Sequence, residues 1–130
     1  MYNPFWNKTL TIFTPLITEE KTIWYKYTKQ NVFFKNDGYK TSGSNYSENN
    51  TCTIRIPCKD FLEYEEWVNS DKISTFSISY ESLLIPKLVD DNIADNTSGT
   101  EIFDKYKCIK PKRITNNSYN YSSHILIIGD

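Results

Sequence analysis

Apolar and polar residues alternate along several short segments of this chain, and a period of two residues predicts β-strands. Between Thr51 and Ile56, for example, Cys52 and Ile54 alternate with polar side chains, and Pro57 closes the segment. The pattern therefore favours a chain built mainly from short strands. The predicted strands are Thr9–Phe13, Thr22–Tyr27, Asn31–Lys35, Thr51–Ile56, Thr75–Ser79, Leu83–Val89, Cys108–Thr115 and Ser123–Ile128.

The connections between these segments indicate neighbouring antiparallel strands. The link at residues 28–30 is short, so Thr22–Tyr27 and Asn31–Lys35 are predicted to form a hairpin or two consecutive strands of a meander. Pro86 interrupts the segment Leu83–Val89, and a proline within a strand predicts an edge strand or a bulge.

One helix is predicted near the end of the chain. Ser98 and Glu101 have the spacing of a capping box, in which Ser98 caps the helix and Glu101 reaches back to it. A helix over Gly99–Lys107 follows from this signal. Residues Asp60–Asn69 are charged and have only a ragged apolar side, so we expect a short helical turn or an ordered loop there.

Two polar segments are predicted to be long loops, residues 36–50 and residues 90–99. The first contains the turn dipeptide Asp37-Gly38 and a short extended piece at Tyr39–Thr41. The whole chain, residues 1–130, is short enough to be a single domain. The predicted fold class is mainly β: a small antiparallel β-barrel or sandwich with one short helix and long loops.

The composition supports a folded chain and excludes some partners. Aromatic residues make up 15% of the sequence, which supplies the bulk that a core needs. Fifteen Lys and Arg balance sixteen Asp and Glu, and only Arg55 and Arg113 are arginines. Because readers of nucleic acid carry a basic excess on one element, we do not expect tight binding to nucleic acid.

The cysteines and the beginning of the chain predict an intracellular protein with reduced thiols. Cys52, Cys58 and Cys108 are odd in number, and no basic and apolar leader follows Met1. The longest apolar run, Ile125–Ile128, is far too short to span a membrane. No membrane partner is therefore expected.

The residue types that carry catalysis or bind metals are scattered. His124 is the only histidine, and we interpret it as a residue at the start of a strand that bonds to the backbone. The three cysteines lack the close pairs of a zinc site. The carboxylate clusters at residues 63–66 and 90–95 lie in segments typical of a solvated surface. We therefore predict no enzymatic activity, no metal site and no cofactor.

Aromatic side chains lie on both faces of the predicted strands between residues 22 and 35. One face is expected to enter the core. The other face is either a protein interface, a platform for a sugar or single-stranded nucleic acid, or a second buried face. With little basic charge nearby we favour an interface over a platform, and a second buried face remains an equal alternative. The candidate interface residues are Trp24, Tyr25, Tyr27, Phe33, Phe34, Tyr46 and Trp67.

The order of several motifs resembles a family of small proteins encoded among the head–tail genes of phages and prophages of low-GC Gram-positive bacteria. Each motif is loose, but together they cover nearly the whole chain. Relatives place Gly-Asp at residues 80–82, and this chain lacks that turn. The motifs are Leu10–Phe13, Ile23–Tyr25, Asn31–Lys35, Ile54–Pro57, Tyr64–Trp67, Phe76–Ile78 and His124–Gly129.

This resemblance implies a structural protein of the virion neck, made in the host cytoplasm. It would be a head-closure (stopper) protein or an adaptor that forms a homo-oligomeric ring of six-fold or twelve-fold symmetry. Its expected partners are the portal or an adaptor and the tail proteins, and DNA would pass through the lumen without specific binding. A tail terminator or another tail component is the alternative in the same class. A stand-alone module that binds carbohydrate or single-stranded nucleic acid is the alternative in another class.

Overall fold

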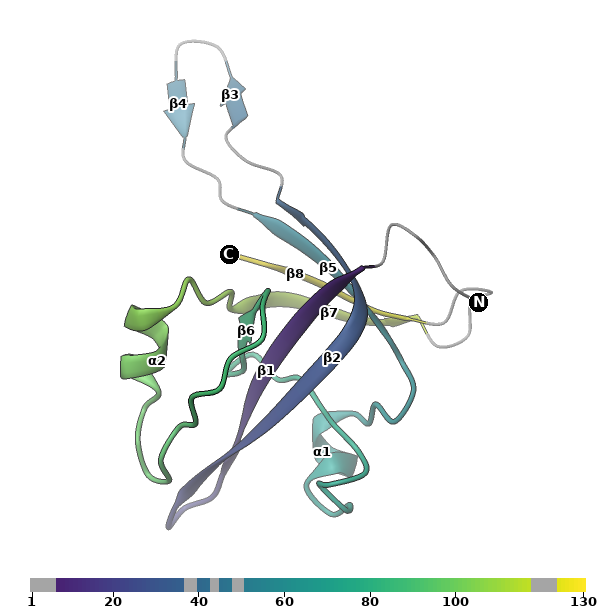
Figure 1. Ribbon diagram of the computed structural model, residues 1–130, viewed down its shortest axis with the longest axis vertical. Coiled ribbons are helices and arrows are strands. Elements are labelled where there is room, and N and C mark those ends of the chain that lie inside the picture. Colours follow the sequence, from purple (N-terminus) through teal and green to yellow (C-terminus); the bar gives the residue numbers. More distant parts are fainter. Residues whose placement is uncertain (1–6, 37–39, 43–44, 48–50, 118–123) are drawn as a thin grey trace.

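The computed structural model describes residues 7–36, 40–42, 45–47, 51–117 and 124–130, with only the backbone described in 40–42 and 45–47. A six-stranded antiparallel sheet curls into a half-barrel that carries two short helices (Figure 1). The predicted mainly β fold is confirmed. The sheet contains β1 (Lys8–Ile17), β2 (Thr22–Asn36), β5 (Cys52–Pro57), β6 (Leu83–Ile85), β7 (Pro111–Asn117) and β8 (His124–Gly129); the helices are α1 (Tyr64–Trp67) and α2 (Thr100–Lys105); and β3 (Lys40–Ser42) pairs with β4 (Asn45–Ser47) in a separate hairpin.

The strand order is β6-β1-β2-β5-β8-β7, so β6 and β7 form the two edges of the sheet. The curl brings these edges together at one end. Leu84 of β6 and Ile109, just before β7, exchange backbone hydrogen bonds of 3.0 and 2.8 Å. The strand predicted over Leu83–Val89 is confirmed as an edge strand only for Leu83–Ile85, and it ends directly before Pro86; residues 86–89 are not a strand.

β2 is one strand of 15 residues that pairs with two neighbouring strands. It pairs with β1 as far as Val32 and with β5 from Phe33 onward. The change of partner occurs beside Asn31, whose φ of 59° marks a break in the register. The prediction of two strands separated at residues 28–30 is therefore wrong. Those residues are mostly polar because Thr28 and the residues of the bend are exposed, not because the strand ends there.

β1 also extends beyond its predicted end at Phe13. Pro15 lies within the strand, opposite Trp24 of β2. On the side of β1 that faces away from β2, β6 pairs only with residues 11–13. Pro15 therefore has no neighbouring strand on that side, and its missing N–H breaks no hydrogen bond between strands.

The segment Thr75–Ser79 alternates like a strand but forms only an isolated bridge, between Phe76 and Phe61. The prediction of a strand there is wrong. Phe76 and Ile78 both enter the main core, and Ser77 between them is also completely buried, with its carbonyl bonded to the hydroxyl of Thr14.

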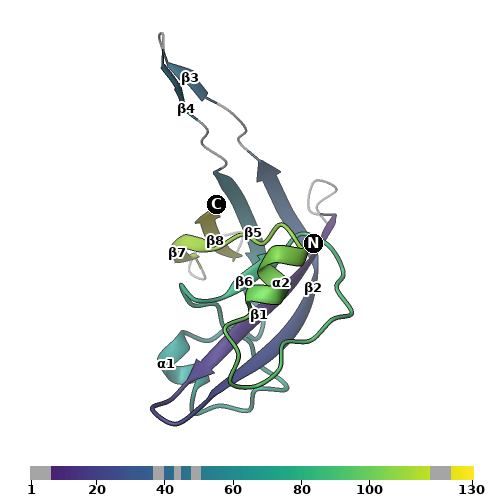
Figure 2. The same cartoon turned by 90° about the vertical axis from the view of Figure 1, so that its left-hand side faces the viewer.

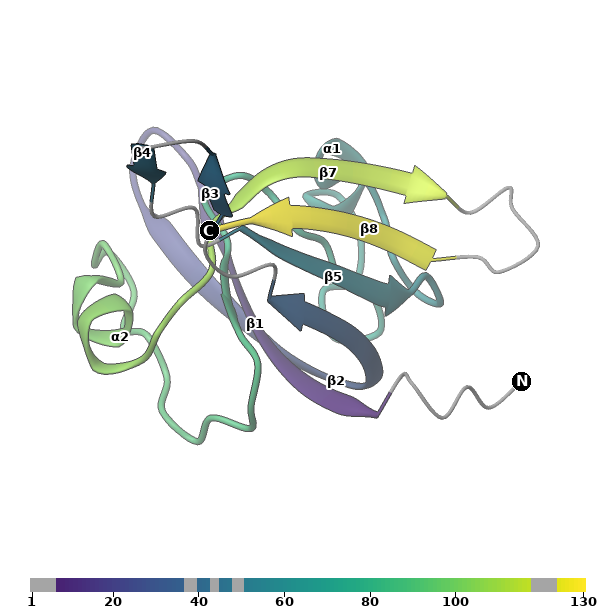
Figure 3. The same cartoon turned by 90° about the horizontal axis from the view of Figure 1, so that it is seen from above.

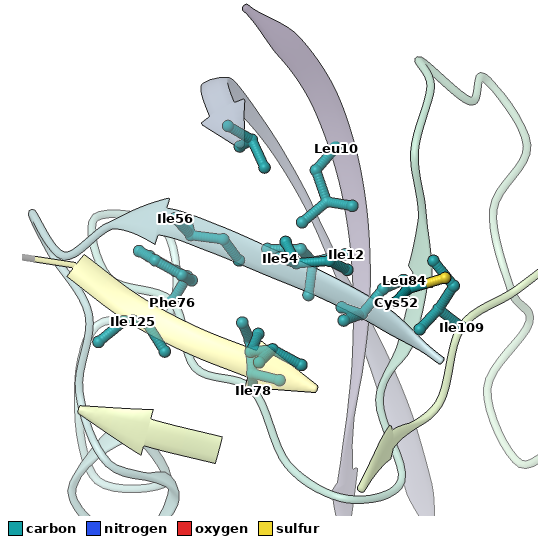
Figure 4. Packing of buried hydrophobic residues seen from close by; sticks show 12 residues of the cluster. Leu10, Ile12, Cys52, Ile54, Ile56, Phe76, Ile78, Leu84, Ile109 and Ile125 are labelled. Carbon is teal, nitrogen blue, oxygen red and sulfur yellow. The ribbon is translucent and has the colours of Figure 1, made fainter. Parts of the chain in front are cut away.

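The main core fills the inside of the half-barrel (Figure 4). Every second residue of β5 and β8 points into it, and Ile54, Ile56, Ile125 and Ile127 are completely buried. The period of two that predicted these strands therefore separates the buried face from the partly exposed one.

A second, smaller core lies on the other side of β1 and β6. Ile12 of β1 belongs to the main core, whereas its neighbour Phe13 points to the opposite side. There Phe13 contacts the segment that leads to α2, including Ile102 of that helix. β1 is thus buried on both faces, which explains its nearly continuous burial. The second core consists of Phe13, Leu83, Ile85, Val89, Ile93 and Ile102.

The helix predicted after residue 98 is confirmed as α2, and α1 is the helical turn expected within residues 60–69. The predicted capping box is wrong. Gly99 precedes the helix in a left-handed conformation (φ 74°), with no side-chain cap, and the hydroxyl of Ser98 bonds to that of Thr100 at 2.5 Å. A Cβ at Gly99 would lie 3.2 Å from the ring of Trp24, so this close approach sets how the helix begins.

The hairpin of β3 and β4 continues from the ends of β2 and β5 and projects beyond the sheet (Figure 2). It occupies part of the polar segment 36–50, and the extended piece expected at Tyr39–Thr41 overlaps β3. The turn predicted at Asp37-Gly38 lies outside the described residues. Residues 90–99 contain no helix or strand.

Gly129 permits the close approach that joins β8 to the residues before β7. A Cβ at this position would lie 2.5 Å from the carbonyl oxygen of Lys110 and 2.8 Å from a side-chain carbon of Ile109. Because backbone would have to move, we expect Gly129→Ala to lower the free energy of unfolding by about 1–3 kcal/mol, measured by urea denaturation.

Asp130→Ala is the matched control for this prediction. It changes the next, exposed residue and removes only an exposed ion pair with Lys112, so it should leave the free energy of unfolding nearly unchanged. Equal stability of Gly129→Ala and the wild type would contradict the close approach.

Candidate interaction surface

Three of the candidate interface residues meet beneath β2, where they hold α1 in place. Trp67 of α1 is completely buried, and its indole N–H donates to the hydroxyl of Tyr27 at 3.0 Å. That hydroxyl donates in turn to the carbonyl of Lys72 at 2.9 Å. The ring of Tyr25 meets Trp67 edge to face, with ring centres 5.4 Å apart. In this conformation Trp67 presents no surface to a partner.

Burial within this cluster raises the pKa of Tyr27 from 10.0 to about 12. The nearby Tyr25 and Asp71 also raise it, while the hydrogen bond from Trp67 lowers it. The folded chain thus holds the phenol proton more tightly than the unfolded chain. The stability that this provides is complete below pH 10 and is lost as the pH rises toward 12.

We therefore expect the wild type to lose stability more steeply above pH 10 than Tyr27→Phe does. Urea denaturation at a series of alkaline pH values measures this difference. Because the other tyrosines are common to both proteins, their ionisation cancels in the comparison. Parallel losses of stability in the two proteins would contradict the raised pKa.

Trp24 has a different environment from the other aromatic residues of β2. Its indole N–H donates to the carbonyl of Thr97 at 2.9 Å, and its ring contacts the second core. Trp24 therefore attaches the 90–99 segment to the sheet. It remains partly exposed beside a shallow hollow that is also lined by Ile17 and Tyr80.

Phe33 and Phe34 are neighbours in β2 and point to opposite faces of the sheet. Phe34 contacts the main core. Phe33 lies on the other side, where the guanidinium of Arg55 sits over its ring at 5.9 Å. Tyr46 lies in β4, where only the backbone is described. Trp24 and Phe33 both face away from the main core, but Trp24 contacts the second core. Among the candidates with described side chains, Phe33 alone lies on that side of the sheet where β2 pairs with β5.

We name that side of β2, β5, β8 and β7 the outer face (Figure 3). The strand register places its side chains in cross-strand rows, and the aliphatic members are partly exposed. No carboxylate occurs in these rows of the described chain. The first row is Phe33, Arg55, Leu126 and Thr115; the second is Lys35, Thr53, Ile128 and Arg113; and the third is Pro57, His124 and Asn117.

Sequence reasoning placed neither arginine in the candidate surface. Both nevertheless lie on the outer face, Arg55 in β5 and Arg113 in β7. A signal was present, because Arg55 occupies a polar position between the buried Ile54 and Ile56. The neighbours of these arginines across the sheet depend on the strand order, which the pattern along the chain does not contain.

His124 begins β8 and is 7% exposed. Its Nε2 lies 3.0 Å from Nη1 of Arg55 and 3.2 Å from Nδ2 of Asn117. Arginine is always a donor, so Nε2 is the acceptor and the ring proton is on Nδ1. His124 thereby fixes the guanidinium of Arg55 against the outer face.

The three cysteines are separate free thiols. Cys52 is buried in the main core, and Cys58 is at its margin. Burial raises the pKa of Cys108 to about 11, although Lys110 lowers it slightly, and its sulfur lies 3.6 Å from the carbonyl of Ile102. In the described parts of the chain, no three metal-ligating side chains come together.

The two acidic clusters differ in their surroundings. Asp91 accepts hydrogen bonds from Lys105 at 2.8 Å and Tyr106 at 2.6 Å, and these bonds lower the pKa of its carboxyl group. Glu65 and Glu66 of α1 are exposed, and neither takes part in an ion pair within the described structure.

The fold and the outer face define a small curled β-sheet protein with a mixed apolar and basic surface. None of the described helices is long and apolar enough to cross a membrane. The chain belongs to a family of unknown function (DUF6751), which matches residues 5–130. No curated protein and no solved structure matches it.

Proposed function

We propose that this protein is a structural subunit of a tailed-phage neck, a head-closure protein or adaptor whose ring joins the portal to the tail. The observation that carries the proposal is the order of motifs along nearly the whole chain. Five of these motifs fall on strands of the one curled sheet, in β1, β2, β5 and β8, and two of the five are in β2.

In this proposal the partners are other copies of the chain, in a six-fold or twelve-fold ring, together with the portal or an adaptor and the tail proteins. DNA passes through the lumen without specific binding. The protein is made in the host cytoplasm and resides in the virion neck. The hairpin of β3 and β4 supports this proposal because it projects beyond the sheet (Figure 2), as an arm that reaches a neighbour does.

We propose a non-catalytic role, and the environment of His124 supports it. Nε2 of this ring accepts hydrogen bonds from Arg55 and Asn117. A general base needs a free acceptor within reach of its substrate proton. The only histidine of the chain is instead used to position an arginine.

Assembly of the purified protein tests the proposal. At high concentration, or mixed with portal particles, it should form rings of six-fold or twelve-fold symmetry in electron micrographs. A chain that stays monomeric and never binds portal or tail particles would overturn the proposal. A chain that binds headless tails but not portals would indicate a tail terminator or another tail component instead.

A module that binds single-stranded nucleic acid or carbohydrate is the second candidate. One observation favours it: Phe33 is on the outer face beside Arg55, and rings beside arginine can stack on bases. Anisotropy of a labelled oligothymidine and calorimetry with soluble oligosaccharides test this candidate. Absence of binding at millimolar ligand would remove it.

A further inference from the structure

Two arginines of the outer face, Arg55 and Arg113, form no ion pair in the part of the chain that the structure describes. Arg113 is exposed. Arg55 is positioned by His124 and Phe33, neither of which is an anion here. Between the arginines lie the partly exposed side chains of Leu126 and Ile128. An apolar centre flanked by arginines is typical of a protein interface.

A second surface has the opposite charge. The hydroxyl of Tyr64 in α1 accepts a hydrogen bond from the N–H of Ile17 at 3.3 Å and donates to the carbonyl of Pro15 at 3.2 Å. These bonds hold α1 beside the turn between β1 and β2. We name the resulting surface the acidic end; its exposed carboxylates are Glu19, Glu20, Glu63, Glu65 and Glu66, with Lys21 in the same turn.

The acidic end also contains an exposed apolar residue. Ile17 is 52% exposed, precedes Glu19 and Glu20 in the sequence, and lines the hollow beside Trp24. The exposed carboxylates of the acidic end are complementary in charge to the arginines of the outer face. Complementary potentials of this kind give an interface its register and its specificity.

The two surfaces point in different directions. α1 lies on the inner side of the sheet and the turn between β1 and β2 is at the far end of the molecule (Figure 1), whereas Figure 3 looks directly onto the outer face. Glu63 accepts a hydrogen bond from Asn116 of β7 at 3.3 Å, so one margin of the acidic end meets the edge of the sheet. None of the acidic-end carboxylates forms an ion pair with Arg55 or Arg113 in the described structure.

We propose that the outer face of one copy binds the acidic end of the next copy. This inference rests on the proposed function, because a head-to-tail contact generates a ring when its rotation closes. It assigns the contact that builds the ring to Arg55 and Arg113 on one side and to α1 and the β1–β2 turn on the other. Salt weakens such a contact, so self-association falls as ionic strength rises.

Sedimentation velocity of charge-reversal variants tests the contact. Arg113→Glu and the double variant Glu65→Lys/Glu66→Lys should each weaken self-association by on the order of 100-fold, since like charges then face each other. A mixture of the two variants should associate again, because each supplies the surface that the other lacks. A single chain with all three substitutions should also regain self-association.

Variants of matched charge serve as controls. Lys107→Glu matches the change of charge in Arg113→Glu, and Glu101→Lys/Asp104→Lys matches that of the double variant. These exposed residues lie in or just after α2, outside both surfaces, and the control variants should associate like the wild type. Circular dichroism checks that each variant folds. If the changes in α1 unfold it, Glu19→Lys/Glu20→Lys replaces them, since these residues lie in the exposed turn between β1 and β2.

The outcomes separate this inference from the proposed function. Rings that form normally in Arg113→Glu and in both acidic-end variants would overturn the inference and leave the neck function standing. Failure of the mixed variants to associate, or loss of oligothymidine binding in Arg113→Glu with unchanged self-association, would also overturn it. A wild type that remains monomeric with and without portal particles would overturn both.

Discussion

Replacing Trp67 by alanine is expected to lower the free energy of unfolding by about 3–5 kcal/mol, the range for removing a buried large aromatic side chain. Trp67 is the largest completely buried side chain of the described structure. Its loss leaves a cavity between α1 and β2 and removes the hydrogen-bond donor to Tyr27. Urea denaturation measures the loss, and hydrogen exchange should show that residues 64–72 open first.

Two variants separate the parts of this effect. Trp67→Phe keeps an aromatic ring but removes the indole N–H, so it should cost less, about 1–3 kcal/mol. Tyr27→Phe removes the acceptor of the same hydrogen bond and keeps the packing of Trp67. If Trp67→Ala cost no more than Trp67→Phe, packing of the ring would not be what holds α1.

Phe13→Ala should have a similar effect, about 3–5 kcal/mol, through the second core. Phe13 is completely buried between β1 and the segment that carries α2. Because the main core lies on the opposite face of β1, we expect α2 and residues 88–108 to lose protection from hydrogen exchange before the strands do. Denaturation and hydrogen exchange together measure both effects.

Phe103→Ala is the control for this second prediction. Phe103 belongs to α2 but is 42% exposed, so its removal should change stability much less. Equal loss of protection in α2 and in β5 of Phe13→Ala would show that the two cores unfold as one unit.

The sequence predicted the strands that have one face in the main core. In β5 and β8 the apolar positions recur with a period of two because one face is buried and the other is not. The same rule failed at residues 75–79. Phe76, Ser77 and Ile78 are all buried, and the segment forms a single bridge, between Phe76 and Phe61. The alternation of residue types there does not correspond to one buried and one exposed face.

β2 shows a second limit of the pattern. β2 pairs first with β1 and then with β5, and polar residues are exposed where it bends between the two. In the sequence, these polar residues resemble a turn between two strands. The capping signal at Ser98 failed for a local reason: the approach of Gly99 to Trp24 determines how α2 begins. Neither contact is encoded in nearby residues.

The candidate surface was predictable in part. Phe33 is on the outer face, whereas Trp24, Tyr25, Tyr27 and Trp67 contact other parts of the same chain. Aromatic residues serve cores and interfaces alike, so composition does not separate the two uses. The separation needs the position of α1 and of the 90–99 segment, which cover these rings from a distance in the sequence. The interface assignment of the aromatic residues stays a prediction.

The strand order has a consequence for how the chain folds. β5, in the middle of the sheet, pairs with β8, the last strand in chain order. The backbone groups on that side of β5 have no partner until some 70 further residues have emerged from the ribosome, at about 5–20 residues per second. We therefore expect slow folding, on the millisecond to second scale of chains with many distant contacts, and a nascent chain that depends on chaperones to protect an open strand edge.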